Sequence, residues 1–461
     1  MSSTASPSDS VAPSYTAAID QLNSLAPELY ARPGQPRRRF SLDEVRILLN
    51  ALGNPQSQFP AVLIAGTNGK GSTASTLASI LAESGRRTGL YTSPHLERPN
   101  ERIRIGDREI ADADFARLYF RVHDAGQQLF LAQRLPQLPS YFEILTALAF
   151  LHFVENKVEV AVLEVGMGGR LDATNVVSPA LSIVTDISLD HMEWLGPTIS
   201  AIAREKAGIL RRAGTMITLP QHPEANQVLG EVATELGVQG ISAVPYLPPT
   251  EITGPYKVDA LGAVITVDSP LAGAHQQRNV ALAIAAAVEL AAHHSFPITP
   301  AAIENGIRRT RWPGRLERIS KLDRITQNRV EWILDVAHNP AGAWALRAGI
   351  RDILETHKPR VLVFSCLRDK PLDEMAQILF PLFDEVILAP IHTARAATLD
   401  DLLAAAAATG TPAVAADSVA DALRLAQDRI TQNCVTGLAV VSGSVYLVGE
   451  ARTLLLSGSS E

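Results

Sequence analysis

From about residue 61 onward, short apolar runs alternate with longer stretches of helical periodicity. Three runs are apolar nearly throughout and rich in β-branched residues: AVLIA (61–65), VEVAVLE (158–164) and ALSIVTDI (180–187). Such runs are typical of strands that are buried on both faces of a parallel sheet. Helical patterns such as STASTLASILAES and YFEILTALAFLHFVEN lie between them. The alternation predicts an α/β fold with a mostly parallel sheet.

A second series of strands follows RWPGRLERI (311–319), a passage rich in proline, glycine and charge. The expected strands are VEWILD, RVLVFS, DEVILAP and GLAVVSGS, each separated from the next by a helical pattern. No G-x-G-x-x-G follows the first of them, so nothing marks a dinucleotide site. We therefore predict a disordered tail over 1–20, a larger α/β domain over 21–314 and a smaller Rossmann-like α/β domain over 315–461.

Composition and charge narrow the class of protein. Hydrophobic residues make up 46% of the 461 residues and charged residues 19%, as in globular proteins with large cores. The formal charge of −7 argues against general nucleic-acid binding but not against small anionic substrates. The two cysteines, Cys366 and Cys434, lie too far apart for a CxxC metal site and suit a reducing compartment. With no secretory signal and no apolar run of about 18 residues, we expect a cytoplasmic protein that binds no membrane.

The stretch AVLIAGTNGKGSTASTLASIL (61–81) is the first candidate site. It departs from the phosphate-loop template G-x-x-x-x-G-K-[ST], because Lys70 lies between Gly69 and Gly71 and the first hydroxyl is Ser72. Between a buried strand and a helix, however, backbone N–H groups converge on one point that suits phosphate oxygens. Lys70 would add positive charge, and Ser72 or Thr73 could meet a magnesium ion. The alternative is a tight turn with a surface lysine, and the strand–loop–helix context favours the phosphate interpretation.

Acidic and imidazole side chains follow the next two predicted strands. Glu164 ends one strand and precedes the glycine-rich GMGG, a position that suits a magnesium ligand. A methyltransferase-like loop and purely structural glycines are the alternatives there. Asp190 and His191 follow the other strand, although a lone histidine is more often structural than a ligand.

Lys206 lies in a charged helical cluster, Arg204-Glu205-Lys206. The default interpretation is a solvated helix face. A lysine can also react with CO₂ to give a carbamate, which requires the neutral amine that burial or a neighbouring cation favours.

In the second domain, polar residues again follow predicted strands. Asp335 and His338 occur in ILDVAHNPAG, and Ser442 and Ser444 in GSVYLVGE and the residues before it. Loops at the carboxyl ends of strands carry ligand contacts in α/β domains, but Asn339-Pro340 and Ser444 are also good helix starts.

Taken in order, these motifs resemble the folylpolyglutamate synthase and dihydrofolate synthase family, within the Mur-ligase-like ATP-dependent amide ligases. They cover residues 60 to 340 densely, and the family's own phosphate loop has the same Gly-Lys-Gly-Ser/Thr order. The motifs that carry the resemblance are GTNGKGS (66–72), TSPHL (92–96), SYFE (140–143), LEVGMGGRLDATN (163–175), LDHMEWLG (189–196), REKAGI (204–209), HQQRNVALA (275–283), WPGRLE (312–317) and LDVAHNP (334–340).

The resemblance implies a role for each matching position. ATP would be bound by Gly66, Thr67, Asn68, Gly69, Lys70, Gly71, Ser72, Asn279, Arg315 and Asp335. Two magnesium ions would be held by Ser72, Glu164, His191 and a carbamylated Lys206. The pterin substrate would contact Ser93, Pro94, His95, Ser140, Tyr141, Phe142, Glu143, Leu171, Ala173 and, as polar anchor, Asp172. His338 and Ser442 would lie on the glutamate side, and the catalytic residues would be Lys70, Lys206 and His338. The region ARPGQPRRRFSLDEV, with arginines at 37–39, departs most from the family.

The resemblance also implies a reaction. L-glutamate would be added to dihydropteroate, to folate or tetrahydrofolate glutamates, or to both, through an acyl phosphate with release of ADP and phosphate. We expect the bifunctional form in a monomer, because the compact two-domain layout resembles the bacterial enzymes that do both. A monofunctional folylpolyglutamate synthase and a non-catalytic ATP-binding protein of the same fold are the alternatives. A cell-wall ligase fits less well, because the roughly 60 residues before the phosphate loop cannot hold a further UDP-binding domain.

Overall fold

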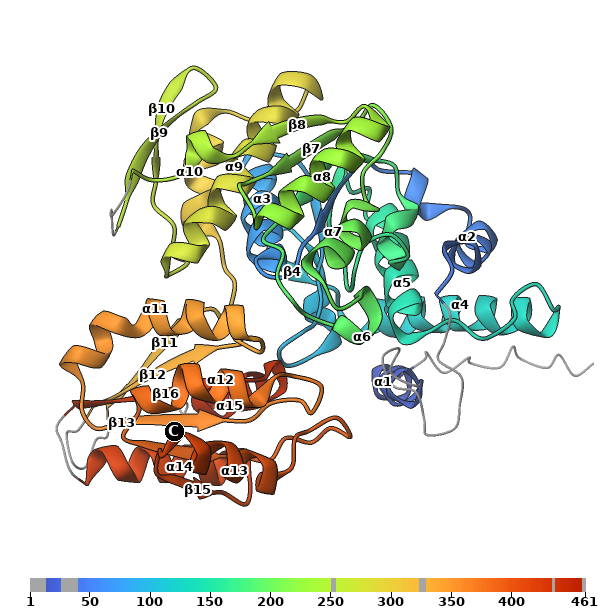
Figure 1. The fold of residues 1–461 in the computed structure, drawn as a ribbon. Coiled ribbons are helices and arrows are strands. Elements are labelled where there is room, and N and C mark those ends of the chain that lie inside the picture. The colour runs from blue at the N-terminus through green and yellow to red at the C-terminus, as the bar shows by residue number, and fades with distance from the viewer. Residues whose placement is uncertain (1–13, 26–39, 250–253, 323–328, 433–435, 458–461) are drawn as a thin grey trace, which may run out of the picture.

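The computed structural model describes residues 14–25, 40–249, 254–322, 329–432 and 436–457. The chain forms two α/β bodies, a larger one coloured blue to yellow and a smaller one coloured orange to red (Figure 1). Among the described residues, none of the helices combines the length and apolar character that a membrane span requires.

The larger body is built on an eight-stranded sheet. Only β3 and β4 pair antiparallel with their neighbours, so the expected mostly parallel sheet is confirmed. Its strands, in spatial order, are β4 (Arg108–Glu109), β3 (Ile103–Ile105), β2 (Thr88–Tyr91), β5 (Val160–Glu164), β1 (Ala61–Ala65), β6 (Pro179–Val184), β7 (Thr215–Thr218) and β8 (Gln239–Ser242).

Helices cover both faces of this sheet, as the continuous apolar runs predicted. Along β1, Leu63 and Ala65 pack into one core while Val62 and Ile64 pack into the other. The first core is closed by α1 (Tyr15–Ser24), α2 (Leu42–Ala51), α4 (Asp112–Leu131), α5 (Tyr141–Glu155), α7 (Ile199–Ala207) and α8 (Pro223–Leu236). The second is closed by α3 (Lys70–Glu83), α9 (Ala274–His293), α10 (Pro300–Arg309) and the hairpin of β9 (Tyr256–Ala260) and β10 (Ala263–Val267).

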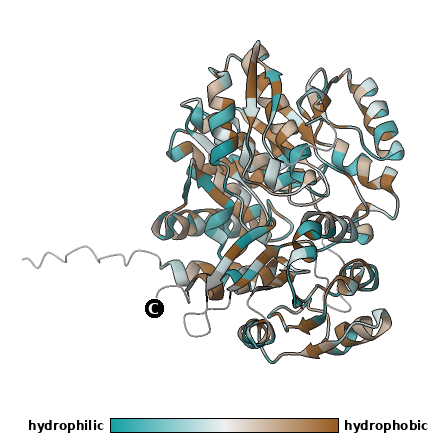
Figure 2. Cartoon of the chain, turned by 90° about the vertical axis from the view of Figure 1, so that its left-hand side faces the viewer, coloured by the Kyte–Doolittle hydropathy of each residue, from teal (hydrophilic) through white to brown (hydrophobic). Residues whose placement is uncertain are grey.

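The smaller body has a six-stranded sheet in the order β11 (Glu317–Leu322), β12 (Arg329–Asp335), β16 (Thr436–Ser442), β13 (Arg360–Phe364), β14 (Glu385–Leu388) and β15 (Ala413–Ala415). One core contains residues of α11 (Pro340–Thr356), α12 (Leu372–Leu379) and α13 (Leu399–Thr409). The other contains residues of α14 (Val419–Thr431) and α15 (Val445–Ser457). In Figure 2 brown and teal residues alternate along the helices, which have one face toward a core and one toward solvent.

Short elements complete the described fold. They are the helix α6 (Met192–Leu195) and the 3₁₀ helices η1 (Pro55–Ser57), η2 (Pro99–Arg102), η3 (Ala173–Val176), η4 (Val244–Tyr246) and η5 (Phe380–Leu382).

Two sequence-based expectations need correction. The sequence places the boundary between the two domains near 314–318, but Glu317 already begins β11, which pairs antiparallel with β12. This pairing is favoured because Leu316 and Ile319 pack against the cores on opposite faces of the sheet.

The predicted tail over 1–20 is wrong from residue 14 onward. Ser14 caps α1, and Ala18 and Leu22 of that helix are buried in the core. The hydroxyl of Tyr15 donates a hydrogen bond to Asn100 Oδ1 (2.6 Å). The small polar residues on the solvent side of α1 hid this helix from the sequence pattern. Residues 1–13 and the arginines at 37–39 lie outside the described residues.

Candidate active site

A cavity of about 620 Å³ lies between the carboxyl ends of the strands of the two sheets. Its walls come from the loops after β1, β5, β6 and β7 of the larger body and after β12 and β16 of the smaller one. In open α/β sheets this is the edge at which ligands bind. Of the residues that the sequence suggested for ATP, metal or catalysis, Thr73 does not line the cavity, whereas these do: Gly66, Thr67, Asn68, Gly69, Lys70, Gly71, Ser72, Glu164, His191, Lys206, Asn279, Arg315, Asp335 and His338.

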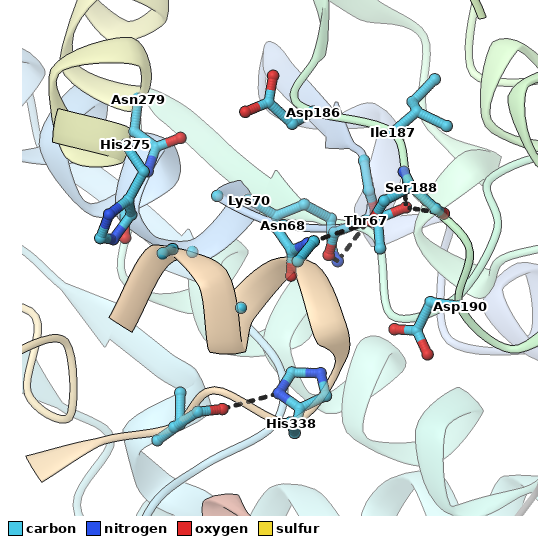
Figure 3. A pocket seen from close by; sticks show the side chains of 18 of the residues that line it. Thr67, Asn68, Lys70, Asp186, Ile187, Ser188, Asp190, His275, Asn279 and His338 are labelled. Carbon is cyan, nitrogen blue, oxygen red and sulfur yellow. Dashed lines mark hydrogen bonds between the residues drawn. The ribbon is translucent and has the colours of Figure 1, made fainter. Parts of the chain in front are cut away.

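The loop at 66–72 turns sharply from β1 into α3. Gly69 has φ +88°, and a Cβ atom there would lie 2.1 Å from Asn279 Oδ1, so this position requires glycine. The Lys70 ammonium folds back over the loop and donates to the carbonyl oxygens of Gly66 (3.1 Å) and Thr67 (3.2 Å). Figure 3 shows Thr67, Asn68 and Lys70 together beside the loop that follows β6. A glycine-rich turn at a helix N-terminus with a lysine over it can hold phosphate oxygens.

Lys206 is buried beneath this loop. Its side chain reaches from α7 to donate a hydrogen bond to Gly66 O (2.7 Å), and the residue is 4% exposed. Burial, and then the positive charge of Lys70, lower its pKa from the ordinary 10.5 to about 7. The solvated helix face is therefore the wrong interpretation for Lys206, although it holds for Arg204 and Glu205, which form ion pairs with Glu231 and Arg170.

Glu164 ends β5 in the wall next to the loop. The carboxylate accepts a hydrogen bond from Ser93 N (3.1 Å) and is 4% exposed. Burial raises its pKa, against the lowering effect of the Lys70 charge. A bound cation would offset the burial of this carboxylate, so the site fits Mg²⁺. The described part of the chain holds no cluster of three or more His, Cys, Asp or Glu that could bind a metal. Mg²⁺ would therefore need further oxygen ligands from Ser72, water and substrate phosphate.

The loop after β6 carries Asp190 and His191. Burial lowers the pKa of His191 to about 4, so its imidazole is neutral at pH 7. Lys370, in the loop after β13, donates to Asp190 Oδ1 at 2.7 Å, and the two side chains are only 4% and 10% exposed. Burial alone would raise the pKa of Asp190, but the charged forms of His191 and Lys370 hold it well below the ordinary range. This pair joins the two bodies beside the cavity.

A second polar contact between the bodies lies close by. Asn339 donates from Nδ2 to Asn68 Oδ1 (3.1 Å), while its own Oδ1 accepts from Gly342 N (2.8 Å) and caps α11. The capping interpretation of Asn339-Pro340 is therefore confirmed. His338 Nδ1 lies 2.8 Å from Val336 O and must carry the proton, because a carbonyl only accepts. Burial, followed by the Lys370 charge, lowers its pKa to about 4, which leaves Nε2 as an acceptor at neutral pH.

Asp335 is held where β12 ends. It accepts hydrogen bonds from Leu316 N and Ala337 N, both at 2.9 Å. Burial raises its pKa, while the Arg315 charge acts in the opposite direction. Asp335 therefore orders the loop that carries Arg315 as well as lining the cavity.

The residues suggested for the pterin substrate are only partly brought to the cavity. Ser93 and Pro94 line it, whereas His95, Ser140, Tyr141, Phe142, Glu143, Leu171, Asp172 and Ala173 do not, and neither does Ser442, which was suggested for the glutamate side. Ser140 and Glu143 form a reciprocal capping box at the start of α5. The Asp172 carboxylate accepts from Gly166 N, Met167 N and both Thr174 donors, so it holds the glycine loop after β5 in place.

Two of the residues suggested as substrate contacts, His95 and Ser442, are buried or hydrogen-bonded inside the fold. His95 accepts at Nδ1 from Arg102 Nε (2.9 Å), and burial lowers its pKa to about 3. Ser442 is fully buried where β16 ends, and its hydroxyl has no hydrogen-bond partner among the described residues.

Sequence reasoning missed three features of this site. Lys370 follows the strand RVLVFS at the same sheet edge as His338, and that position was the available signal. Arg278 pairs with Asp186 (2.6 Å) and ties α9 to the loop after β6. The ring of Trp312 lies against Gly71, where a Cβ atom would be 2.6 Å from Cζ2. The last two contacts join segments far apart in the sequence, and no local pattern indicates them.

Comparisons with known proteins agree with the two-body architecture. The family model described as "Mur ligase middle domain" matches residues 64–287, and "Mur ligase, glutamate ligase domain" matches residues 314–445. A folylpolyglutamate synthase of Lacticaseibacillus casei is 35% identical, over 97% of this chain and 100% of its own length. A dihydrofolate synthase/folylpolyglutamate synthase of Mycobacterium tuberculosis is also 35% identical, over 90% of each chain. The crystal structure of a Mycobacterium tuberculosis folylpolyglutamate synthase complexed with ADP and AMPPCP superposes with a TM-score of 0.82 at 33% identity, covering 96% of this chain and 99% of that one.

Proposed function

The chain belongs to the folylpolyglutamate synthase and dihydrofolate synthase family of Mur ligases, ATP-dependent enzymes that form amide bonds, and we propose that it joins L-glutamate to pteroate and folate acceptors. One observation carries the proposal. The glycine loop with Lys70, the buried Lys206 and Glu164, and the polar loop with His338 all line a single cavity between the two bodies. A cavity of this volume lies within the range of small-molecule binding sites.

The first step joins two anions, the acceptor carboxylate and the γ-phosphate of ATP. The carboxylate oxygen attacks phosphorus, which gives an acyl phosphate and ADP. Lys70 and the N–H groups at the start of α3 face the cavity where the phosphates would lie, and they would offset the charge that develops there. Bound Mg²⁺, held through Glu164, Ser72 and the neutral His191, would supply further positive charge.

Lys206 suits conversion to a carbamate. With a pKa of about 7, a large part of its amine is neutral at physiological pH and able to react with CO₂. The carbamate would place carboxylate-like oxygens beside Gly66 and provide a ligand for a second magnesium ion. The cavity position of Lys206 supports this proposal.

In the second step the glutamate amine attacks the acyl carbonyl, an amide bond forms and phosphate leaves. His338 presents a neutral Nε2 acceptor on the side of the smaller body, where it would orient the amine. Closure of the two bodies, held by the contacts of Asp190 and Asn68 across the interface, would exclude water from the acyl phosphate.

We propose that both dihydropteroate and reduced folates are accepted. The relative from Mycobacterium tuberculosis is named for both activities, whereas that from Lacticaseibacillus casei is named for one. The two-body layout and the cavity are compatible with either acceptor. A protein that binds ATP without ligase activity is the alternative from a different class.

The deciding experiment measures ADP release with Mg²⁺-ATP and L-glutamate, in parallel reactions with 7,8-dihydropteroate and with tetrahydrofolate. Turnover with both acceptors supports the bifunctional assignment, and turnover with one restricts the enzyme to that reaction. ATP binding without glutamate-dependent ADP release would favour the non-catalytic alternative.

A further inference from the structure

Arg452, on α15 of the smaller body, connects segments of both bodies. Its Nη1 donates to Glu97 Oε1 (2.7 Å), and its Nε lies 3.0 Å from each oxygen of Glu317. Glu97 belongs to the loop that follows β2 in the larger body, and Glu317 begins β11. The three side chains are 22–31% exposed, so they are partly shielded from solvent.

The loop that carries Glu97 is ordered and reaches the cavity. The Glu101 carboxylate accepts hydrogen bonds from the backbone N–H groups of residues 96, 97 and 98, at 2.7–2.8 Å. At its start, Ser93 N donates to Glu164 in the cavity wall. The carbonyl of Leu96 lies so close to α15 that a Cβ atom on Gly449 would be 2.0 Å from it. The helix α15 therefore packs directly on the loop that begins at Ser93.

Glu317 connects the same arginine to the segment between the two bodies. Its carboxylate also accepts from Gly314 N (2.9 Å). In that segment, Trp312 lies against Gly71 of the phosphate loop and Arg315 lines the cavity. One guanidinium therefore links the Ser93 loop to the segment that touches the phosphate loop.

We propose that Arg452 is a positioning residue, which holds the loop at 93–98 against the segment at 312–317 and so aligns the acceptor with the ATP phosphates. The proposal rests on the proposed function, because it takes Ser93 and Pro94 as acceptor contacts and residues 66–72 as the phosphate loop. The planar guanidinium, with several N–H donors in fixed directions, can serve both carboxylates at once. Lysine offers a single ammonium centre without the fixed planar fork of the guanidinium.

A purely structural role makes a different prediction. Partly exposed ion pairs contribute little to global stability, so loss of Arg452 should leave unfolding almost unchanged. A positioning role should instead weaken acceptor use while ATP binding is preserved.

The test compares Arg452→Gln and Arg452→Lys with the wild type. Arg424→Gln is the matched control, because Arg424 pairs only with Asp421 and Asp428 of its own helix α14 in the described structure. For both Arg452 variants we expect the acceptor KM to rise about tenfold, with the Kd of an ATP analogue and the melting temperature as in the control. Glu97→Gln should give the same acceptor defect, and the double variant Glu97→Gln/Arg452→Gln should be no worse than either single change.

Hydrogen–deuterium exchange of residues 92–102 reads the position of the loop without turnover. We expect about tenfold faster exchange at the amides of residues 96–98 in Arg452→Gln and no change in Arg424→Gln, because the loop would lose its ion pair with α15. Unchanged exchange and an acceptor KM within about twofold of wild type would overturn the proposal. A wild type without ligase activity would refute the proposed function alone, since the hydrogen–deuterium exchange comparison still decides whether Arg452 holds the loop.

Discussion

Replacing Lys370 with methionine removes the ion pair that joins the two bodies beside the cavity. Lys370 Nζ lies 2.7 Å from Asp190 Oδ1, and the side chains are 4% and 10% exposed. Methionine keeps much of the length and apolar surface of lysine but cannot donate a hydrogen bond. The substitution therefore leaves Asp190 as a buried carboxylate without its cationic partner.

The free-energy cost of this substitution follows from the surroundings of Asp190. Removal of one partner from a buried ion pair costs about 3–5 kcal/mol, because the remaining charge is still buried. In the wild type His191 and His338 carry no charge at pH 7 that would pair with Asp190, because burial is the largest cause that lowers the pKa of each to about 4. The other donors to Asp190 are neutral: the backbone N–H of His191, 2.9 Å from Oδ1, and Asn339 Nδ2, 3.5 Å from Oδ2. Separation of the bodies would hydrate Asp190, so we expect the cost to appear as domain opening rather than as global unfolding.

Small-angle scattering of the ligand-free protein measures the opening directly. The radius of gyration should increase in Lys370→Met, stay unchanged in the exposed control Lys257→Met, and return toward wild type in Lys370→Met/Asp190→Asn. The radius of gyration of the double variant should return toward wild type, because removing both charges costs less free energy than leaving one buried charge without a partner. Since the pKa of Asp190 is held below its ordinary 3.8, the pair is complete above that value, and the wild type should not open between about pH 8 and pH 5. An unchanged radius in the single variant, or a double variant as open as the single one, would contradict this reasoning.

Three further substitutions test the phosphate loop and its surroundings. Lys70→Ala should lower ADP release at least about 100-fold. It should not unfold the protein, because the ammonium contacts only carbonyls of its own loop in the described structure. Near wild-type turnover would refute the loop assignment. Lys206→Met should abolish turnover. Burial lowers the Lys206 pKa from 10.5 to about 7, so between these pH values the unfolded chain binds a proton that the folded chain does not. The free energy of unfolding of the wild type should therefore rise by about 2 kcal/mol relative to the variant from pH 7 to 9, measured by urea unfolding in CO₂-free buffer. Gly71→Ala should displace Trp312, weaken ATP binding and lower the free energy of unfolding by about 1–3 kcal/mol, with tryptophan fluorescence as the measurement. The control is Gly230→Ala, where a Cβ atom meets nothing within 4 Å.

The elements that could be predicted from the sequence are those whose signal is local. A buried strand, a glycine turn and a helix follow one another within 61–81, and the structure forms them there. Lys206 could not be placed in the same way. Its neighbours Arg204 and Glu205 form surface ion pairs, and only the packing of α7 against Gly66 makes the third charged residue a buried one. Asp172 shows the converse, because a motif that suggested substrate binding is satisfied by donors two to six residues away.

The contacts between the two bodies were beyond sequence reasoning because their partners are distant. Asp190 and Lys370 are 180 residues apart, and neither has a local signal that identifies the other. These contacts nevertheless decide whether the cavity exists, since its walls come from both bodies. If only a fraction of molecules is closed, the apparent affinity for a ligand that needs both walls falls by that fraction. Opening by Lys370→Met should therefore weaken acceptor and glutamate together, whereas loss of Arg452 in a closed molecule should weaken the acceptor alone. A ligand that contacts only the phosphate loop should be insensitive to both changes. These three patterns of affinity separate a defect in docking from a defect in loop position, which a loss of turnover by itself would not do.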